Sequence, residues 1–151
     1  MSNNHPTLIG WKESIDLPEW GIIDITAKAD TGARRSAIDV EHIVELPGGQ
    51  VQFEVAANRR TGQLRRTIVA KIAHQTHVRS SNGQQHERYF VETSVRVGEV
   101  TKKIELSLSN RKHMQCRMLL GRKALENDFL VDCSNIYVTR PNRRPKIARA
   151  K

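Results

Sequence analysis

Cysteines, aromatic residues and long apolar runs are all scarce in this chain of 151 residues. Cys116 and Cys133 lie far apart in the sequence and form no CxxC motif, so we interpret them as reduced, partly buried thiols rather than as a disulfide or metal ligands. No apolar segment approaches the length of about 20 residues that a transmembrane helix needs. Residues 1–6 lack the pattern of a signal peptide. These absences predict a cytoplasmic protein that does not cross a membrane.

Positive charge is concentrated at the end of the chain. The formal net charge is +9, and the last twelve residues, RPNRRPKIARAK, hold six Lys and Arg and no acid. Without these six, 19 of the 25 basic residues remain against 16 acidic ones, a net charge of +3. We therefore divide the chain into a single domain, 1–139, and a basic, disordered tail, 140–151. The tail either contacts RNA, the ribosome or an acidic partner, or is simply solvated.

The apolar residues favour strands over most of the domain. Apolar and polar residues alternate from residue 23 to 30, which is the period of a half-buried strand. Turn residues follow at 46–50, 80–83 and 98–99, between further segments rich in β-branched residues. Residues 118–120 resemble a short apolar strand, 122–127 a short helix and 129–138 a returning strand. Short strands separated by such turns predict an all-β fold, either a small closed barrel or a sandwich.

Asp30, Thr31 and Gly32 form the motif with the most chemical content. Asp-Thr-Gly alone is weak evidence, because an aspartate before a glycine is usually a turn residue. Here, however, a strand runs directly into the motif and Ala33 follows it. About ninety residues later, the segment MLLGRKAL places apolar residues before Gly121 and Arg122. The two segments together resemble the retropepsin-like aspartic proteases, small closed β-barrels in which an apolar-Gly-Arg segment passes behind the Asp-Thr-Gly loop.

The resemblance extends over residues 8–138. The segments IGWKESIDLPEWGI, AKADTGARRSAI and MLLGRKALENDFLVD look like a bacterial family that is often labelled ATP-dependent zinc protease and linked to the glutamate ligase that modifies a ribosomal protein. The chain contains neither HExxH nor a Gly-rich loop with GK[ST]. We therefore predict no zinc, ATP or other cofactor.

The resemblance implies an aspartic endopeptidase. In such an enzyme, Asp30 is the catalytic acid, the Thr31 hydroxyl braces the paired loops, and Gly32 and Ala33 lie against the substrate. Gly121 and Arg122 support the site from behind. Since hydrolysis uses two carboxylates and this chain has one Asp-Thr-Gly, an active enzyme requires a homodimer that brings two copies of the acid together.

A flap over the site is expected at the hairpin formed by residues 80–83. Its turn contains Asn82 and Gly83, which suit the positive backbone angles of a tight turn. We count both as candidate substrate-binding residues. The alternative is an ordinary surface hairpin.

In the viral retropepsin-like enzymes, the arginine of the Gly-Arg pair contacts an acid that directly follows Asp-Thr-Gly-Ala. Here that position is Arg34, and Arg35 follows it. Because Arg34 and Arg35 cannot pair with Arg122, we expect Arg122 to pair with Asp128 or Asp132. The same two arginines would make the mouth of the site cationic, which indicates binding of acidic, glutamate-rich peptide segments. Solvated surface charges are the alternative interpretation.

Other functional classes remain open from the sequence. His74, His77 and His86 could approach one another around the 80–83 turn, but they lack a clear third ligand, so we interpret them as surface histidines and predict no metal site. The fold could also have lost cleavage and serve as a binding or regulatory protein. A third possibility is an RNA- or ribosome-binding module that acts through the tail and the basic loop 57–66.

Overall fold

A six-stranded closed β-barrel forms the centre of the protein. The computed structural model describes residues 5–56, 65–79, 82–110 and 116–141. Its elements are β1 (Thr7–Gly10), β2 (Lys12–Leu17), a 3-10 turn (Pro18–Trp20), β3 (Ile22–Ala29), β4 (Ser36–Asp39), β5 (Glu41–Leu46), β6 (Gln50–Ala56), β7 (Arg65–Lys71), β8 (His74–Arg79), β9 (Gln85–Val97), β10 (Val100–Ser109), β11 (Met118–Leu120), α1 (Arg122–Leu125) and β12 (Phe129–Asp132).

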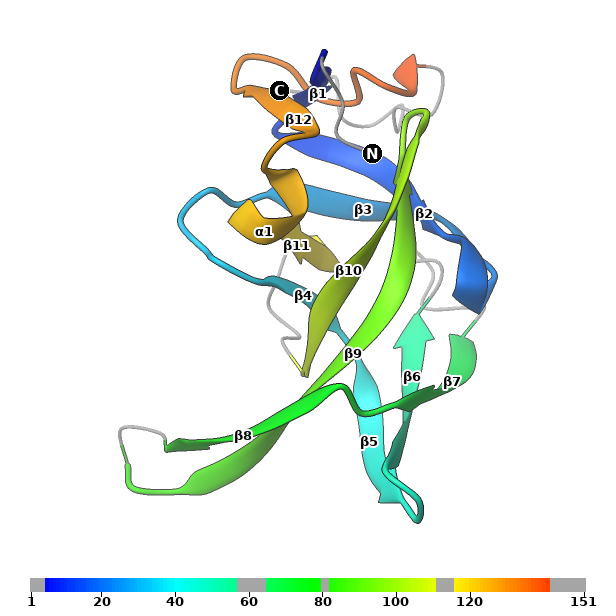
Figure 1. Cartoon of the computed structure of the whole chain (residues 1–151), viewed down its shortest axis with the longest axis vertical. Helices are drawn as coiled ribbons and strands as arrows, with labels where there is room; N and C mark the ends of the chain where they lie inside the picture. The colour runs from blue at the N-terminus through cyan, green and yellow to red at the C-terminus, as the bar shows by residue number, and fades with distance from the viewer. Residues whose placement is uncertain (1–4, 57–64, 80–81, 111–115, 142–151) are drawn as a thin grey trace.

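Pairing between β9 and β10 closes the barrel. The strand order is β10-β4-β11-β3-β2-β9, and β10 pairs with β9 along most of its length (Figure 1). Strand β11 runs parallel to β3 and antiparallel to β4, so it lies between them. The prediction of a small closed all-β barrel with one short helix is therefore confirmed.

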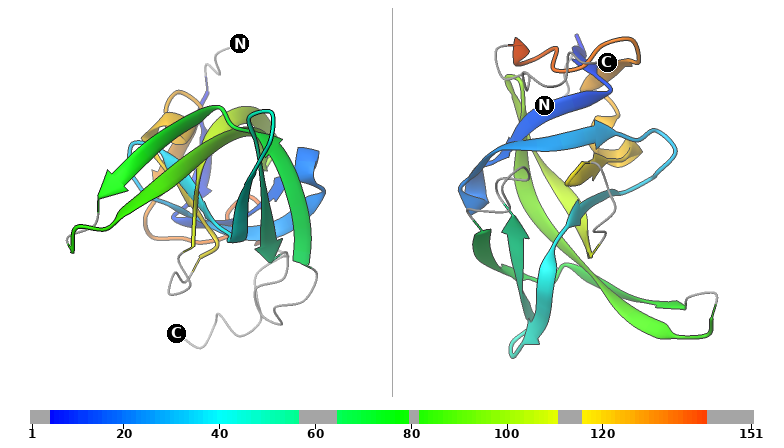
Figure 2. Two further views of the ribbon diagram at one scale, coloured as in Figure 1. Left: turned by 90° about the horizontal axis from the view of Figure 1, so that it is seen from below. Right: turned by 180° about the vertical axis from the view of Figure 1, so that it is seen from behind.

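Three additions lie outside the barrel. Strand β8 pairs with the first half of β9 and forms a long hairpin that leaves the barrel (Figure 2). Strands β5, β6 and β7 form a separate three-stranded antiparallel sheet. Strands β1 and β12, near the two ends of the described chain, pair in parallel as a two-stranded sheet. The hairpin and the β1–β12 sheet both bear on the candidate site below.

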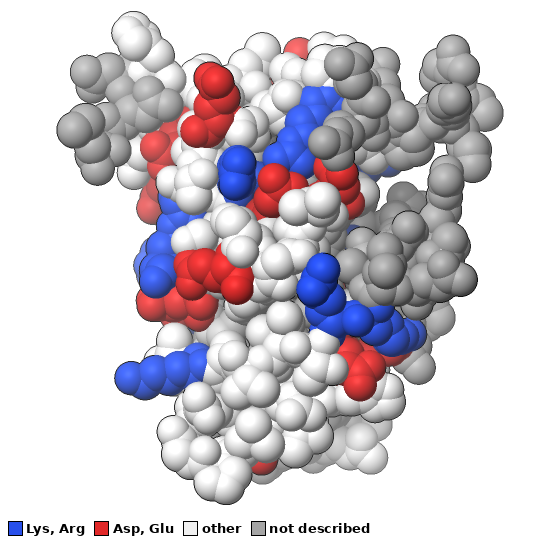
Figure 3. Space-filling view, turned by 90° about the vertical axis from the view of Figure 1, so that its right-hand side faces the viewer, with Lys and Arg blue, Asp and Glu red and all other residues white. Residues whose placement is uncertain are grey.

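One face of the described surface mixes both signs of charge. On the face shown in Figure 3, Lys and Arg side chains alternate with Asp and Glu side chains among the described residues. Within the described part of this face, charge is distributed in small clusters of both signs rather than in one basic patch. The tail predicted to contact RNA or the ribosome lies outside the described residues apart from Arg140 and Pro141, as do residues 57–64 of the basic loop.

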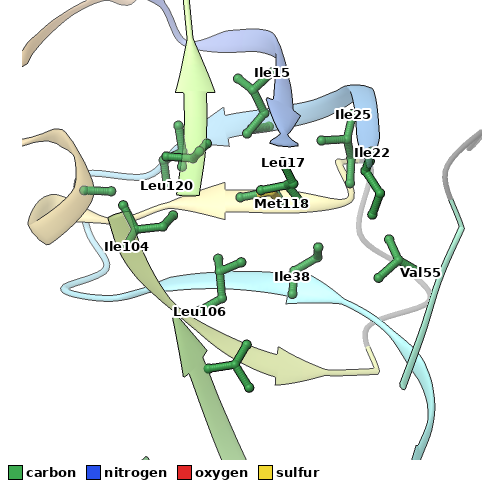
Figure 4. Close-up of a cluster of buried hydrophobic side chains, with 14 of the residues drawn as sticks. Ile15, Leu17, Ile22, Ile25, Ile38, Val55, Ile104, Leu106, Met118 and Leu120 are labelled. Carbon is green, nitrogen blue, oxygen red and sulfur yellow. The ribbon is translucent and has the colours of Figure 1, made fainter. Parts of the chain in front are cut away.

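Aliphatic side chains fill the barrel. Period-two alternation directs one side chain in two inward along each strand, and residues from six strands meet there. The largest fully buried side chains include those of Ile15, Leu17, Ile25, Leu106 and Met118 (Figure 4). Of the two free cysteines, Cys116 is buried and Cys133 is exposed, so only Cys116 fits the expected burial. Within the described ranges, no helix is long and apolar enough to cross a membrane.

Two predicted elements end earlier than expected. Helix α1 stops at Leu125 because Glu126 has an extended backbone and Asn127 a φ of 73°, which breaks the helical hydrogen-bond pattern. Strand β12 stops at Asp132, whose carboxylate accepts bonds from Ser134 N–H (2.8 Å) and Asn135 Nδ2 (2.7 Å). These bonds hold the pKa of Asp132 below its ordinary value. They also fold the chain into a turn where the strand was predicted to continue.

Arg140, the first residue of the predicted tail, is fixed to the barrel. Its guanidinium donates to both carboxylate oxygens of Asp16, at 2.9 and 2.7 Å, and to Asp24 Oδ1 at 3.0 Å. The buried Glu13 holds the preceding residues, accepting bonds from Val138 N–H at 2.9 Å and Thr139 Oγ1 at 2.8 Å. Two β2 carboxylates therefore anchor the end of the domain, which places Arg140 with the barrel. Residues 142–151 of the predicted tail lie outside the described residues.

Replacing Arg140 should weaken the fold only above acidic pH. The hydrogen bonds from Arg140 hold the pKa of Asp16 below its ordinary value of 3.8. Such a lowered pKa contributes stability that is present above the unfolded pKa and is lost as pH falls through the folded one. We expect Arg140→Gln to lower the free energy of unfolding by about 2 kcal/mol at pH 7. Urea titrations at several pH values should show this difference shrinking below pH ~4. The exposed Arg79→Gln is the control, and a difference that persists unchanged at low pH would contradict the assignment.

Candidate active site

Backbone hydrogen bonds fix the loop that carries Asp30. Strand β3 ends at Ala29, whose N–H donates to Trp11 O at 2.8 Å. The N–H of Asp30 then donates to Leu120 O at 2.8 Å, and Ala33 N–H returns to Asp30 O at 3.2 Å. The half-buried Asp30 side chain accepts the Gly32 N–H on Oδ1 at 3.0 Å. Its carboxylate is thus held through Oδ1 at the end of a barrel strand.

The segment 120–123 passes directly behind this loop. Arg122 N–H donates to Ala33 O at 2.8 Å, and Lys123 N–H donates to Arg34 O at 3.0 Å. Gly121 N–H donates to the buried Ser36 Oγ at 3.0 Å. A Cβ atom on Gly121 would lie 2.5 Å from Arg35 O, so only glycine permits this approach. The two motifs singled out in the sequence are therefore in direct contact.

The prediction for the partner of Arg122 is wrong. Its Nη1 donates to the carbonyl oxygen of Thr31 at 3.0 Å. Asp128 instead pairs with Lys102 Nζ at 2.6 Å, and Asp132 is occupied by its own turn. Arg122 is the first residue of α1, so the Arg122 side chain lies beside the Asp30 loop. The backbone carbonyl of Thr31 there takes the place of the expected acid. Arg122 still links helix α1 to the Asp-Thr-Gly loop.

Arg34 and Arg35 differ in environment. Arg34 is exposed. The guanidinium of Arg35 lies 4.8 Å from the ring centre of Phe90 and its Nε lies 3.7 Å from Glu105 Oε1. Arg35 is thus oriented by a cation–π contact and an ion pair, whereas Arg34 projects into solvent.

A groove of about 740 Å³ opens beside Asp30. Of the predicted site residues, Asp30, Ala33 and Arg35 line it, and Thr31, Gly32, Arg34, Asn82 and Gly83 are not among its lining residues. The remaining lining comes from barrel strands β4, β10 and β11, from β5, from the residue after β10 and from the arm of the β8–β9 hairpin. These residues are Ser36, Ala37, Ile43, His86, Glu87, Arg88, Phe90, Ser107, Leu108, Ser109, Asn110 and Leu119. The groove is large enough to hold several side chains of an extended peptide.

The arm of the predicted flap reaches the groove, but the described residues of its tip, Asn82 and Gly83, do not line it. Asn82 Oδ1 accepts the Gln84 N–H at 3.2 Å, and Gly83 has a φ of 87°, as a tight turn requires. Ser80 and Ser81 lie outside the described residues. The groove contacts begin at His86, so the hairpin arm supplies the wall.

Sequence reasoning missed the serines and the arginine of this wall. Ser107 and Ser109 are two apart on β10, and Arg88 and Phe90 are two apart on β9. Period two puts each pair on one face of its strand. The period-two spacing is visible in the sequence. Whether the two strand faces border the same groove, however, depends on the register between β9 and β10, which the local sequence does not determine.

The histidines do not gather into one cluster. His77 lies opposite Glu87 across the hairpin, with Nδ1 3.8 Å from Glu87 Oε1, and His86 lies opposite Val78. His74 packs edge-on against Phe90, with ring centres 5.0 Å apart. Over the described ranges, no group of three or more His, Cys, Asp or Glu side chains is placed to hold a metal ion.

Comparison with known proteins identifies the family. The model of the RimB-like family, described as retropepsin-like aspartic endopeptidase RimB, matches residues 8–142. The chain belongs to this family. The match includes the barrel, the Asp30 loop and the anchored Arg140.

The relatives at the sequence level are longer proteins. A "Probable alpha-L-glutamate ligase" of Shewanella pealeana is 34% identical over 140 residues, which cover 91% of this chain but 30% of that protein. One of the same name from Parasynechococcus marenigrum is 35% identical over 130 residues, 83% of this chain and 28% of that protein. The chain thus spans less than a third of the length of these relatives.

A solved structure shares the fold of this RimB-like chain. The protein Lpg0085 of Legionella pneumophila, of unknown function, superposes with a TM-score of 0.72 at 22% identity, covering 89% of this chain and 99% of the other. At that identity, the match speaks for the fold alone.

Proposed function

We propose that this RimB-like chain is one subunit of a homodimeric aspartic endopeptidase whose catalytic dyad is Asp30 and its symmetry mate. The main structural support is the loop that holds Asp30. Hydrogen bonds with Leu120, Gly32 and Arg122 fix this loop, and it opens on a groove of about 740 Å³. Family membership supports peptide hydrolysis as the reaction. The single Asp-Thr-Gly supports the need for a second copy.

Two close carboxylates can perform the hydrolysis without a cofactor. They cannot both ionise at short distance, so the pair shares one proton and its two pKa values separate. The ionised carboxylate takes a proton from water as the water oxygen attacks the peptide carbonyl carbon, and the protonated one donates to the carbonyl oxygen. The resulting tetrahedral intermediate breaks its C–N bond as the nitrogen takes up the proton that the first carboxylate received, and one hydroxyl of the intermediate returns its proton to the second carboxylate. Thr31 would brace the two loops, and Gly32 and Ala33 would border the substrate.

An exposed apolar pair beside the site offers a surface for the second copy. Leu8 and Leu130 are partners in the β1–β12 register, and their side chains are 50% and 58% exposed. This sheet leads directly to the site, because Trp11 follows β1 and accepts the Ala29 N–H. We infer that the copies meet along this face, which would place both Asp30 loops near the symmetry axis.

Leu130→Asp should dissociate the dimer. A buried carboxylate on each side of a symmetric interface would lose its hydration without gaining a partner. We expect the dimer dissociation constant, measured by sedimentation equilibrium, to rise by about 10-fold or more, with activity falling in parallel. Ile23→Asp is the matched control, because Ile23 is 65% exposed on β3 and lies outside this sheet. A Leu130→Asp protein that remained dimeric would remove this face from the proposal.

Acidic peptides are the proposed substrates. The exposed Arg34 and the groove residue Arg35 put positive charge beside the carboxylate. The relatives named glutamate ligase are consistent with a glutamate-rich partner, such as a ligase product, and with association between this chain and a ligase. The test incubates the protein with a peptide that contains a run of glutamates and with its glutamine counterpart, and detects products by mass spectrometry. Cleavage of the glutamate peptide is expected, and cleavage of neither would overturn the proposal.

A further inference from the structure

Strands β9 and β10 separate at the groove. Their last paired residues are Ser107 and Phe90. Continuing the register by two residues would set Ser109 opposite Arg88. Instead, β10 stays against β4, where Ser109 pairs with Asp39, and β9 leaves with β8, where Arg88 pairs with Thr76. The separation leaves a gap between the two strands, with Ser109 on one side and Arg88 on the other, and both residues line the groove.

We call this separation of β9 and β10 the fork. The side chains of Ser109 and Arg88 that border it both carry hydrogen-bond donors without a partner among the described residues. The Oγ atom of Ser109 is buried and makes no hydrogen bond to a described residue. Leaving a buried hydroxyl without a partner costs free energy, so a ligand group here would be stabilised. The exposed Arg88 has no acid within ion-pair distance in the part of the chain that the structure describes.

The neighbouring charges are already occupied. Glu87 also lines the groove, but its Oε2 accepts bonds from Gln75 Nε2 at 2.5 Å and from Tyr89 OH at 3.0 Å. Arg35 is engaged with Glu105 and Phe90. Phe90, held between Arg35 and His74, fixes the base of the hairpin arm two residues from Arg88. Among the described residues that line the groove, Arg88 is therefore the cation without an acidic partner.

We propose that this fork is a subsite for the side-chain carboxylate of a glutamate in the bound peptide, with Arg88 and Ser109 as its donors. The planar guanidinium of Arg88 supplies two parallel N–H donors to the two carboxylate oxygens, and the Ser109 hydroxyl donates to one of these oxygens. This assignment rests on the proposed peptidase function and deepens it, because it places recognition of acid on the hairpin wall rather than on Arg35. Arg35 instead positions Phe90.

Arg88→Gln tests the subsite through selectivity. The experiment measures kcat/KM on the glutamate peptide and on its glutamine counterpart. We expect the variant to lose about 10- to 100-fold on the glutamate peptide and less than about 2-fold on the glutamine peptide. Ser109→Ala should show a smaller loss with the same selectivity. Arg79→Gln is the matched control, because Arg79 is exposed on the same hairpin but is not a lining residue of the groove. Equal losses on both peptides would overturn the subsite.

A binding measurement separates this proposal from the peptidase function. The affinity of Asp30→Asn protein for a fluorescent hexaglutamate peptide is compared with that of Asp30→Asn/Arg88→Gln protein. A dissociation constant about 10-fold weaker in the double variant supports the subsite even if the wild-type chain cleaves nothing. Absence of binding to the Asp30→Asn protein, or equal binding by both proteins, would overturn it.

Discussion

Asp30→Asn should abolish peptide cleavage while leaving the fold intact. An amide can neither take the proton of the attacking water nor share a proton with the opposite carboxylate, so the reaction loses both of its acid–base partners. We expect kcat to fall by about 10³-fold or more. The bond from Gly32 N–H goes to Oδ1, and an asparagine side-chain oxygen can accept the same bond. The melting temperature should therefore change little.

The control for this variant is Glu126→Gln. Glu126 is exposed immediately after helix α1, so this variant removes one negative charge near the site without touching the groove. It should retain wild-type activity. Full proteolysis by Asp30→Asn at its pH optimum would reject the aspartic mechanism. Lost cleavage of a peptide that the variant still binds would fit the proposal. A wild-type chain that bound the peptide without cleaving it would instead favour a binding or regulatory protein.

Gly121→Ala should damage both the fold and the site. The added methyl carbon would meet Arg35 O at 2.5 Å and Arg34 C at 2.9 Å, and both contacts are backbone atoms that cannot rotate away. Relief requires the 120–123 segment to move from the Asp30 loop, which would lengthen the bonds to Ala33 O and Arg34 O. We expect a loss of about 2–4 kcal/mol in the free energy of unfolding, measured by urea denaturation. In the fraction that remains folded, activity should also fall.

Gly32→Ala is the comparison that distinguishes the cost of a close backbone contact from the cost of replacing any glycine in these two motifs. A Cβ at Gly32 meets only the end of the Asp30 side chain, at 3.3 Å. Its cost in stability should be under about 1 kcal/mol. If Gly121→Ala were as mild as Gly32→Ala, the close contact between the two motifs would not matter to the fold.

Local patterns predicted the strands, and the family resemblance implied the contact between the two motifs. Alternation along β3 and the turn residues after β5 and β9 are local signals, and the barrel follows from them together with the family resemblance. The partner of Arg122 was not predictable in this way. An arginine in a sequence is expected to pair with an acid, but the acceptor here is the backbone carbonyl oxygen of Thr31. Every residue carries such a carbonyl group, so the sequence does not single out Thr31.

Long-range register explains the other omissions. Nothing near Arg140 in the sequence indicates that Asp16 and Glu13, more than a hundred residues earlier, anchor the end of the domain. The fork likewise depends on where the β9–β10 pairing stops at Ser107 and Phe90. Neither Ser107 nor Phe90 is a proline or glycine that would mark the end of the pairing. The two strands separate there because each continues beside a different neighbour, β10 beside β4 and β9 beside β8.

Mixing wild-type and Asp30→Asn chains tests the shared dyad most directly. The total concentration is held constant, the chains are allowed to exchange, and cleavage is measured as the wild-type fraction falls. If each active dimer needs two Asp30 residues, activity follows the square of that fraction and drops to about a quarter in an equal mixture. Activity that falls only in proportion, to about half in the equal mixture, would contradict a dyad shared between two copies.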